Sequence, residues 1–384
     1  AIIVVVLGAF AFGLARHVHD RRTPVLESGP SYRPRGAYHV RADVQERGLV
    51  SLDALASRAK AAGLSFVVIT DPNAQLAGPV VRDGVVILSY AELATPAGLV
   101  VGLGTGYVLS AGERMAPRIH EAIRSLGGVP VISHPSDPKR PWTGEHEGAG
   151  GFEIASFAPT SRRLAGSFSF GLVPLVLGAQ VNARLALAQL YERDREALRL
   201  WDAETRDVVG FCGAGSLEAI DATQDLSTWN LILDDALPDD PGQRPVALLD
   251  QLSRGAFFCA AGLFGEAPYF EFGARNGNEW TGKNGGIVRD IDAAELVVLG
   301  PSTTIGSPSI VLLRNGEDVA RVHGRELRYR DPTPGIYRVE VRVPVPFVVS
   351  GERSVPVIYS NRIRVVSTLL PGMLEDPDAQ ELLP

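Results

Sequence analysis

The stretch AKAAGLSFVVITDPN, residues 59–73, decides the fold class, because it leads from the end of a helix into a buried strand. The segment 51–63 has apolar residues on one face, Ser51 to cap its start and Gly63 to end it, so it predicts a helix. The apolar run 64–70 then predicts a strand that is buried on both faces. A helix followed at once by such a strand is typical of a parallel sheet.

The same alternation continues along the chain. The pattern predicts further strands and helices. The strands are expected at 37–40, 84–93, 98–104, 129–135, 151–156 and 208–216, and the helices at 115–128, about 178–203 and 246–255. Strands that alternate with helices imply a parallel sheet, open or closed as a barrel. Parallel barrels carry their chemistry on the loops after the strands, where His39, Asp71, Glu92, His134 and Cys212 fall.

The pattern changes after about residue 290. From there, apolar and polar residues alternate, with Asn-Gly and Pro-Gly turns between the runs. This predicts a small antiparallel β-sandwich of the immunoglobulin-like sort at 289–367. The turn-rich segment 276–286 is expected to be a loop that joins the barrel to the sandwich. The last residues, 368–384, show no clear element and are expected to be a tail.

The N-terminal segment is apolar. Residues 1–15 carry no charge, and residues 16–22 are dense in charge. Fifteen apolar residues fall short of the roughly 20 that span a bilayer, but the chain begins without Met. We expect an uncleaved transmembrane anchor at 1–22, followed by a linker at 23–36; a signal-peptide core is the rival interpretation.

Composition excludes some classes of protein. The formal net charge is -7, and no basic stripe is visible, so we expect no nucleic-acid partner. The two cysteines, Cys212 and Cys259, lie in small or apolar surroundings. We therefore expect no disulfide framework.

The order of these motifs resembles the PHP (polymerase and histidinol phosphatase) superfamily, especially its CehA/McbA-type metallohydrolase-like members. The resemblance runs from about residue 36 to 366. It is carried by YHVRAD, AKAAGLSFVVITDPN, AELATPAGLVVGLG, VISHP and GFEIAS, and near the C-terminus by PGIYRVEV and VIYSNRIRV. It implies a distorted parallel (β/α) barrel of PHP type at 37–288, with the immunoglobulin-like sandwich after it and the membrane helix before it.

Active members of that family bind two or three metal ions through His-x-His, Thr-Asp-His, a Glu, Gly-His, His-Pro and Asp-x-His. Carried over position by position, three of the eight ligand positions keep a ligand: His39, Glu92 and His134. The other five do not match: Arg41, Pro72, Leu99, Cys212 and Ala214. The resemblance therefore implies a metal site that has lost most of its ligands.

Chemistry supports that interpretation. Multinuclear hydrolysis needs several carboxylates and imidazoles to hold cations close together. A guanidinium cannot ligate a metal, so we expect Arg41 to pair with Glu92 instead. We expect no metal and no cofactor. The opposing interpretation keeps one zinc ion on His39, Glu92, His134 and Cys212.

Three functions follow from these observations. The first is a non-catalytic, membrane-anchored accessory or scaffold subunit of an integral membrane protein complex, with an energy-converting assembly as one instance of that partner. The second is a residual mononuclear metal-dependent phosphoesterase or hydrolase. The third is an anion-binding module that uses the old site, with Arg41 as the contact. The soluble part is expected on the periplasmic side of the inner membrane, as in similar exported proteins, although Arg16, Arg21 and Arg22 favour the opposite orientation.

Overall fold

The structure is a computed structural model of the 384-residue chain. It describes residues 2–19, 26, 33–42, 51–72, 76–114, 118–156, 187–188, 191–216, 229–265, 267–303, 307–347 and 351–368. The expected tail at 368–384 lies almost entirely outside these ranges. So does much of the helix expected at 178–203, of which the structure describes α7 (Arg195–Asp202).

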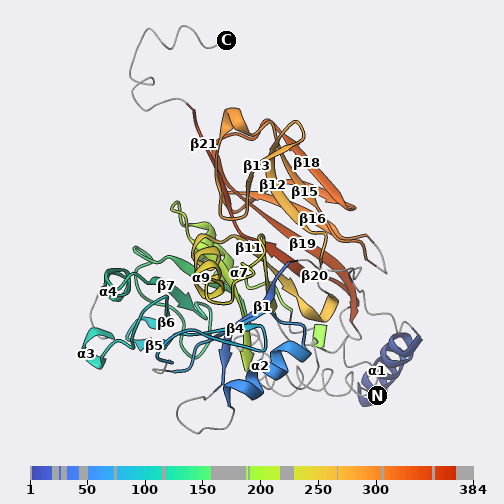
Figure 1. The fold of residues 1–384 in the computed structure, drawn as a ribbon. Coiled ribbons are helices and arrows are strands. Elements are labelled where there is room, and N and C mark those ends of the chain that lie inside the picture. The colour runs from blue at the N-terminus through green and yellow to red at the C-terminus, as the bar shows by residue number, and fades with distance from the viewer. Residues whose placement is uncertain are drawn as a thin grey trace.

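The first half of the chain forms a closed barrel of mostly parallel strands (Figure 1). Its strands are β1 (Arg35–Arg41), β2 (Phe66–Ile69), β4 (Val85–Ser89), β5 (Glu92–Thr95), β6 (Gly98–Leu103), β7 (Val129–Ser133), β8 (Gly151–Ser156) and β9 (Val209–Ser216). The order around the ring is β2, β1, β9, β8, β7, β6 and β5. The ring closes because β4, directly before β5, pairs with β2, and because Pro72 bridges to Glu92. Within this ring, β6 runs antiparallel to both neighbours.

Local sequence explains the elements of the barrel. Strand β2 is Phe-Val-Val-Ile and is buried along its whole length, as parallel strands covered on both faces are. Helix α2 (Leu52–Ala61) begins where the Ser51 hydroxyl accepts a hydrogen bond from the Ala54 amide at 3.1 Å. Its buried face packs against β2 and β4 in one apolar cluster. These predicted elements are confirmed.

Five further α-helices are described in whole or in part. They are α1 (Ile2–His19), α3 (Ala111–Arg114), α4 (Ile119–Ser125), α7 and α9 (Arg244–Arg254). Helix α9 ends where Gly255 adopts φ 74°, a left-handed conformation that glycine takes without strain. The helix expected at 115–128 is limited to α4 in the described residues.

Two further sheets form the second half of the molecule. The larger joins β10 (Trp229–Leu233), β11 (Phe257–Ala261), β20 (Gly351–Ser360), β19 (Gly335–Phe347), β16 (Ser309–Arg314) and β17 (Glu317–His323), all antiparallel. At the start of β19, β21 (Ile363–Val366) pairs with it and with β14 (Ile287–Arg289). The smaller has the order β13 (Glu279–Lys283), β12 (Glu271–Asn276), β15 (Glu295–Leu299) and β18 (Glu326–Arg330). Buried residues of both sheets belong to one apolar cluster, so the sheets pack face to face.

The segment 276–286 differs from the sequence-based expectation. It is a hairpin arm rather than a joining loop, because β13 lies within it and pairs with β12. Strand β12 in turn pairs with β15. The smaller sheet therefore spans the boundary that was expected between residues 288 and 289. Turns flank β13 on both sides, one at Asn276-Gly277 before it and one at Gly285 and Gly286 after it. These turns give the segment the composition of a loop.

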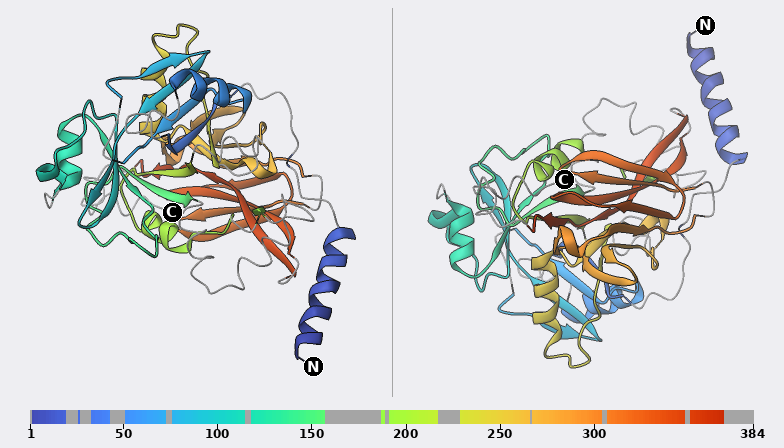
Figure 2. Two further views of the ribbon diagram at one scale, coloured as in Figure 1. Left: turned by 90° about the horizontal axis from the view of Figure 1, so that it is seen from below. Right: turned by 90° about the horizontal axis from the view of Figure 1, so that it is seen from above.

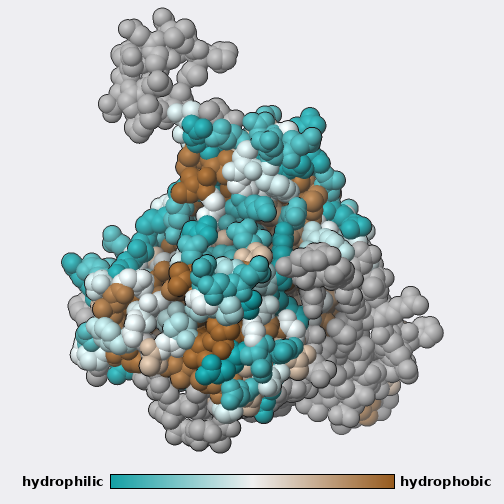
Figure 3. Space-filling view, in the orientation of Figure 1, coloured by the Kyte–Doolittle hydropathy of each residue, from teal (hydrophilic) through white to brown (hydrophobic). Residues whose placement is uncertain are grey.

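The barrel and the larger sheet are continuous. Strand β1 pairs with β9 along its second half and with β10 along its first residues. From β10 the hydrogen bonding continues through β11 into β20. On the face shown in Figure 3, hydrophobic residues reach the surface in separate groups between hydrophilic ones. The apolar core lies between the sheets and inside the barrel.

The N-terminal helix α1 stands beside the rest of the molecule, on the side of the β19–β20 hairpin in all views (Figures 1 and 2). Among the described residues, no helix combines the length and the apolar character needed to cross a membrane. The transmembrane anchor at 1–22 stays a prediction. In the expected linker at 23–36, Leu26 is fully buried and its amide donates to the Phe264 carbonyl at 2.5 Å. This point of the linker is therefore fixed to the body of the protein.

Candidate functional site

Three expected ligand positions meet inside the barrel. His39 lies in β1, Glu92 begins β5, and His134 directly follows β7. All three are at most 3% exposed. His39 Nε2 lies 3.1 Å from Glu92 Oε1, and the rings of His39 and His134 are 4.6 Å apart. The residues that the sequence places on separate strands thus form one cluster.

A second carboxylate completes the cluster, and sequence reasoning missed it. Glu153 in β8 is 2% exposed, and its Oε2 lies 2.9 Å from His134 Nδ1 and 3.3 Å from His39 Nδ1. The same oxygen accepts a hydrogen bond from the His134 amide at 3.0 Å. A glutamate in the middle of the apolar strand GFEIAS was the available signal, because a fully buried glutamate needs a partner.

Both histidines have unusual backbone conformations. His39 adopts φ 60° and His134 φ 46°. A shift in the β1–β2 register lies between Ala37 and Val40, as in a β-bulge. Positive φ in a non-glycine residue costs of order 1–3 kcal/mol and persists where the surroundings impose it. Here the buried ion pairs to Glu92 and Glu153 hold the side chains in place.

Arg41 and Glu92 form the pair expected from the sequence. Arg41 Nη2 lies 2.5 Å from Glu92 Oε2, on the opposite carboxylate oxygen from His39. The Arg41 side chain is 39% exposed, whereas that of Glu92 is 2% exposed. Arg41 therefore closes the cluster towards the solvent with a permanent positive charge.

These contacts shift the pKa values of the cluster. Burial alone would lower the pKa of His39, but the charges of Glu153 and Glu92 raise it to about 10. Burial alone would raise the pKa of Glu92, but His39, Arg41 and His134 lower it to about 2. The pKa of Glu153 lies well below its usual value, because His134 and His39 outweigh its burial. With no ion bound, the two carboxylates therefore favour the protonated form of His39.

The other expected positions offer no ligand. Pro72 takes part through its backbone bridge to Glu92, and Leu99 lies half-buried in β6. Ala214 in β9 is buried in the apolar cluster beneath α2. Apolar side chains at these positions cannot bind a metal.

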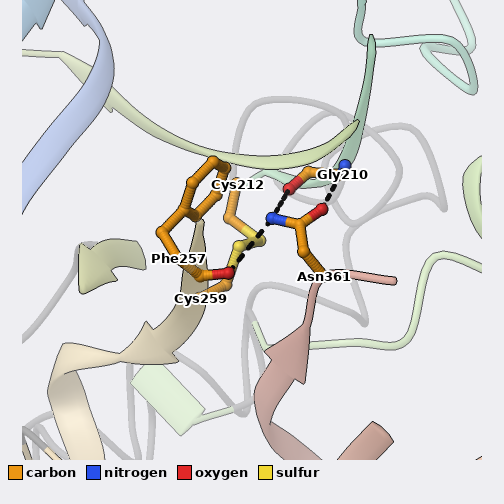
Figure 4. The surroundings of a disulfide bond; sticks show 5 residues. All are labelled: Gly210, Cys212, Phe257, Cys259 and Asn361. Atoms are coloured by element: carbon orange, nitrogen blue, oxygen red, sulfur yellow. Dashed lines mark hydrogen bonds between the residues drawn. A yellow bond between two sulfur atoms is a disulfide. The ribbon is translucent and has the colours of Figure 1, made fainter. Parts of the chain in front are cut away.

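Cys212 is bonded to Cys259 (Figure 4). The expectation of no disulfide is therefore wrong: β9 and β11 lie close together, although the two cysteines are 47 residues apart in sequence. A Cβ added at Gly213 would lie 1.8 Å from Glu153 Oε1, so that side of β9 faces the cluster. Cys212, the preceding residue, points to the other face. A disulfide-bonded cysteine has no thiolate that could bind a metal. The single zinc site that was expected to include Cys212 therefore does not form.

The donor atoms of these residues decide whether the metal centre implied by the resemblance can form. Three donors, from His39, His134 and Glu153, lie within 4.8 Å of one another. In the described residues no further ligand set accompanies them, and the nearby Arg41 repels cations. Each ring nitrogen of His39 lies within 3.3 Å of a carboxylate oxygen, of Glu92 on one side and of Glu153 on the other. The residues do not fit a centre of two or three ions.

Comparison with known proteins adds no family. No protein-family model matches the chain, and no curated protein matches it.

Proposed function

We propose that the barrel is of the PHP type and that the two C-terminal sheets form an immunoglobulin-like sandwich. The closed, mostly parallel ring supports the first assignment. So does the position of His39, Glu92 and His134, which come from three separate strands and meet inside the ring as the ligands of that family do. The face-to-face packing of two antiparallel sheets supports the second.

The barrel serves a non-catalytic role. The observation that carries this proposal is the buried network in which Glu92 pairs with Arg41 and His39, while Glu153 contacts His39 and His134. Arg41 brings a permanent positive charge to the place where bound metal ions would bring theirs. Without a multinuclear centre, the site has no means to lower the pKa of a water molecule for hydrolysis.

The protein acts as a membrane-anchored accessory or scaffold subunit of an integral membrane complex. The apolar segment at 1–15 and the folded body, which offers broad sheet surfaces, support this role. The Cys212–Cys259 disulfide supports a periplasmic location, because disulfides persist in oxidising compartments.

The test combines metal analysis with affinity purification. The full chain is purified from native membranes in mild detergent, and its zinc, manganese and iron content is measured by mass spectrometry. We expect less than about a tenth of an equivalent of metal, since no multinuclear ligand set is present, together with a reproducible membrane partner. Metal at two or more equivalents would overturn the non-catalytic role. Purification of the chain alone would overturn the accessory role.

A second candidate, a mononuclear hydrolase, rests on the three donors of His39, His134 and Glu153. These would hold a single ion only if His39 lost its proton, and Glu153 takes the place that was expected of Cys212. About one equivalent of zinc in the wild type, lost in Glu153→Gln and kept in the surface variant Glu196→Gln, would favour this candidate.

A further inference from the structure

A cavity of about 380 Å³ lies outside the barrel, between residues 188 and 191–195 on one side and the β19–β20 hairpin on the other. Four arginines and one glutamate line it: Arg193, Arg195, Arg342, Arg353 and Glu192. The chain as a whole has a formal net charge of -7. A concave site with this excess of positive charge attracts anions.

Two of the arginines are held in fixed positions by a buried carboxylate. Glu340 has no exposed surface. It accepts hydrogen bonds from Arg193 Nε at 3.0 Å and from Arg342 Nε at 3.0 Å. Each arginine also donates to it through Nη2. In the part of the chain that the structure describes, the Nη1 group of each has no hydrogen-bond partner.

Glu340 does not neutralise this arginine cluster. Arg338, fully buried behind it, also donates to Glu340 at 2.8 Å and pairs with Asp202 at 2.6 Å. Among the residues that the structure describes, three guanidinium groups thus share two carboxylates, which leaves one positive charge. Burial alone would raise the pKa of Glu340, but Arg338, Arg193 and Arg342 lower it to about 2, so the carboxylate stays ionised.

The outer two arginines lie at the rim. Arg353 is 3.7 Å from Glu192, and both side chains are nearly half exposed. Arg195 begins α7, is exposed and has no ion-pair partner among the described residues. Arg195 and Arg353 thus border the cavity, whereas Arg193 and Arg342 are held inside it by Glu340.

We propose that this cavity is a binding site for a phosphate-bearing anion, with Arg193 and Arg342 as the fixed contacts and Arg195 and Arg353 as the rim contacts. Guanidinium groups suit phosphate oxygens because their N–H groups form paired, charge-assisted hydrogen bonds. The volume exceeds what one phosphate needs, so it leaves room for a further polar group, such as that of a sugar phosphate or a phospholipid headgroup. The β19–β20 hairpin and α1 lie on one side of the molecule (Figure 2), which places the cavity near a bilayer if α1 is inserted.

The experiment uses the full chain in detergent and titrates it by calorimetry with inorganic phosphate, short-chain phosphatidylglycerol and short-chain phosphatidylcholine. Binding of phosphate and phosphatidylglycerol, weakened by added salt, supports the site and a soluble ligand. Binding of phosphatidylglycerol without phosphate or phosphatidylcholine supports the site and a lipid source. Binding of none of these probes, or of all three alike, overturns the proposal.

The variant Arg195→Ser/Arg353→Ser separates the cavity from general surface charge, and it leaves the buried Glu340 contacts intact. The loss of two charge-assisted contacts should weaken binding at least about tenfold. The matched control is Arg289→Ser/Arg321→Ser, which removes two exposed arginines elsewhere on the C-terminal sheets. Equal weakening in the control would overturn the proposal. Because the assay measures binding at a site outside the barrel, its failure would leave the non-catalytic role of the barrel untouched.

Discussion

Glu92 receives two cations on its two oxygens, His39 on Oε1 and Arg41 on Oε2. Each oxygen thus lies beside a basic side chain, although Oε1 forms no hydrogen bond within the described part of the chain. A buried carboxylate that loses a charged partner is destabilising, because the charge left behind has no water to solvate it. The stability of this barrel should therefore depend on Arg41, although Arg41 itself is partly exposed.

Replacing Arg41 with alanine should lower the free energy of unfolding by about 1–3 kcal/mol, the cost of leaving a buried polar group without its partner. The expected loss is below that of a fully buried pair, because water can reach the vacated side of Glu92. Urea denaturation followed by circular dichroism measures it. Arg82→Ala, which removes a pair at 3.5 Å between exposed side chains, is the control and should change little. An unchanged midpoint for Arg41→Ala would contradict the pairing.

The pH dependence of stability should report the protonation of His39. Its pKa in the folded state, about 10, lies above its ordinary value of 6.5. The contribution of the imidazolium is therefore complete below 6.5 and is lost as the pH rises towards 10. The slope reaches at most about 1.4 kcal/mol per pH unit.

Urea midpoints of the wild type and of His39→Gln, measured from about pH 6 to about pH 9, isolate this effect. The difference in urea midpoint between the wild type and His39→Gln should become smaller as the pH rises. A difference that grows with pH would indicate a neutral, metal-binding imidazole instead, because metal ligation requires loss of the proton.

At the scale of elements, the residues of β8 and β9 that face the cluster fit closely against each other. Gly213 in β9 leaves the space that the Glu153 carboxylate of β8 occupies. A Cβ there would be 1.8 Å from Oε1, which Glu153 could relieve only by leaving His39 and His134. The glycine is required by this close approach rather than by its own backbone angles.

Gly213→Ala should therefore destabilise the protein by about 1–3 kcal/mol, the usual cost of overpacking, with more if the ion pairs break. Thermal denaturation compares it with Gly78→Ala, whose Cβ would meet nothing within 4 Å. Equal melting temperatures in the two variants would show that Glu153 does not occupy this space.

Elements with local signals were predictable from sequence. Helix α2 and strand β2 could be predicted because the helix cap, the periodic apolar face and the apolar run all lie within a few residues of one another. The meeting of His39, Glu92 and His134 came from the resemblance, and the Arg41–Glu92 pair from chemistry. Glu153 and the partners of β13 were missed, because both depend on contacts between strands far apart in sequence.

At the scale of the whole molecule, the disulfide fastens β9 of the barrel to β11 of the larger sheet. Asn361 reinforces this junction: its side chain accepts from the Gly210 amide and donates to the carbonyls of Gly210 and Phe257 (Figure 4). Sequence spacing alone could not reveal the bond, because two cysteines in apolar surroundings have the same pattern when they are free.

We make two predictions about the disulfide, one for stability and one for its presence in native membranes. Its cysteines have a sequence separation of 47, so the loss of the bond in Cys212→Ser/Cys259→Ser should reduce the free energy of unfolding by about 4 kcal/mol on the chain-entropy relation. In protein from native membranes, alkylation under denaturing, non-reducing conditions should modify neither cysteine, as intact mass would show. Modification of both would remove the support for an oxidising compartment.

The hydrogen bonds that run from β1 through β10 and β11 into β20 have a mechanical consequence. When two domains are joined only by a linker, they can rotate relative to each other about that linker, and each domain can unfold at its own temperature. Here a rotation of one half against the other would have to shear a row of backbone hydrogen bonds and break a disulfide. We therefore expect the barrel and the C-terminal sheets to move as one rigid body. A partner that binds the C-terminal sheets would then also fix the orientation of the barrel.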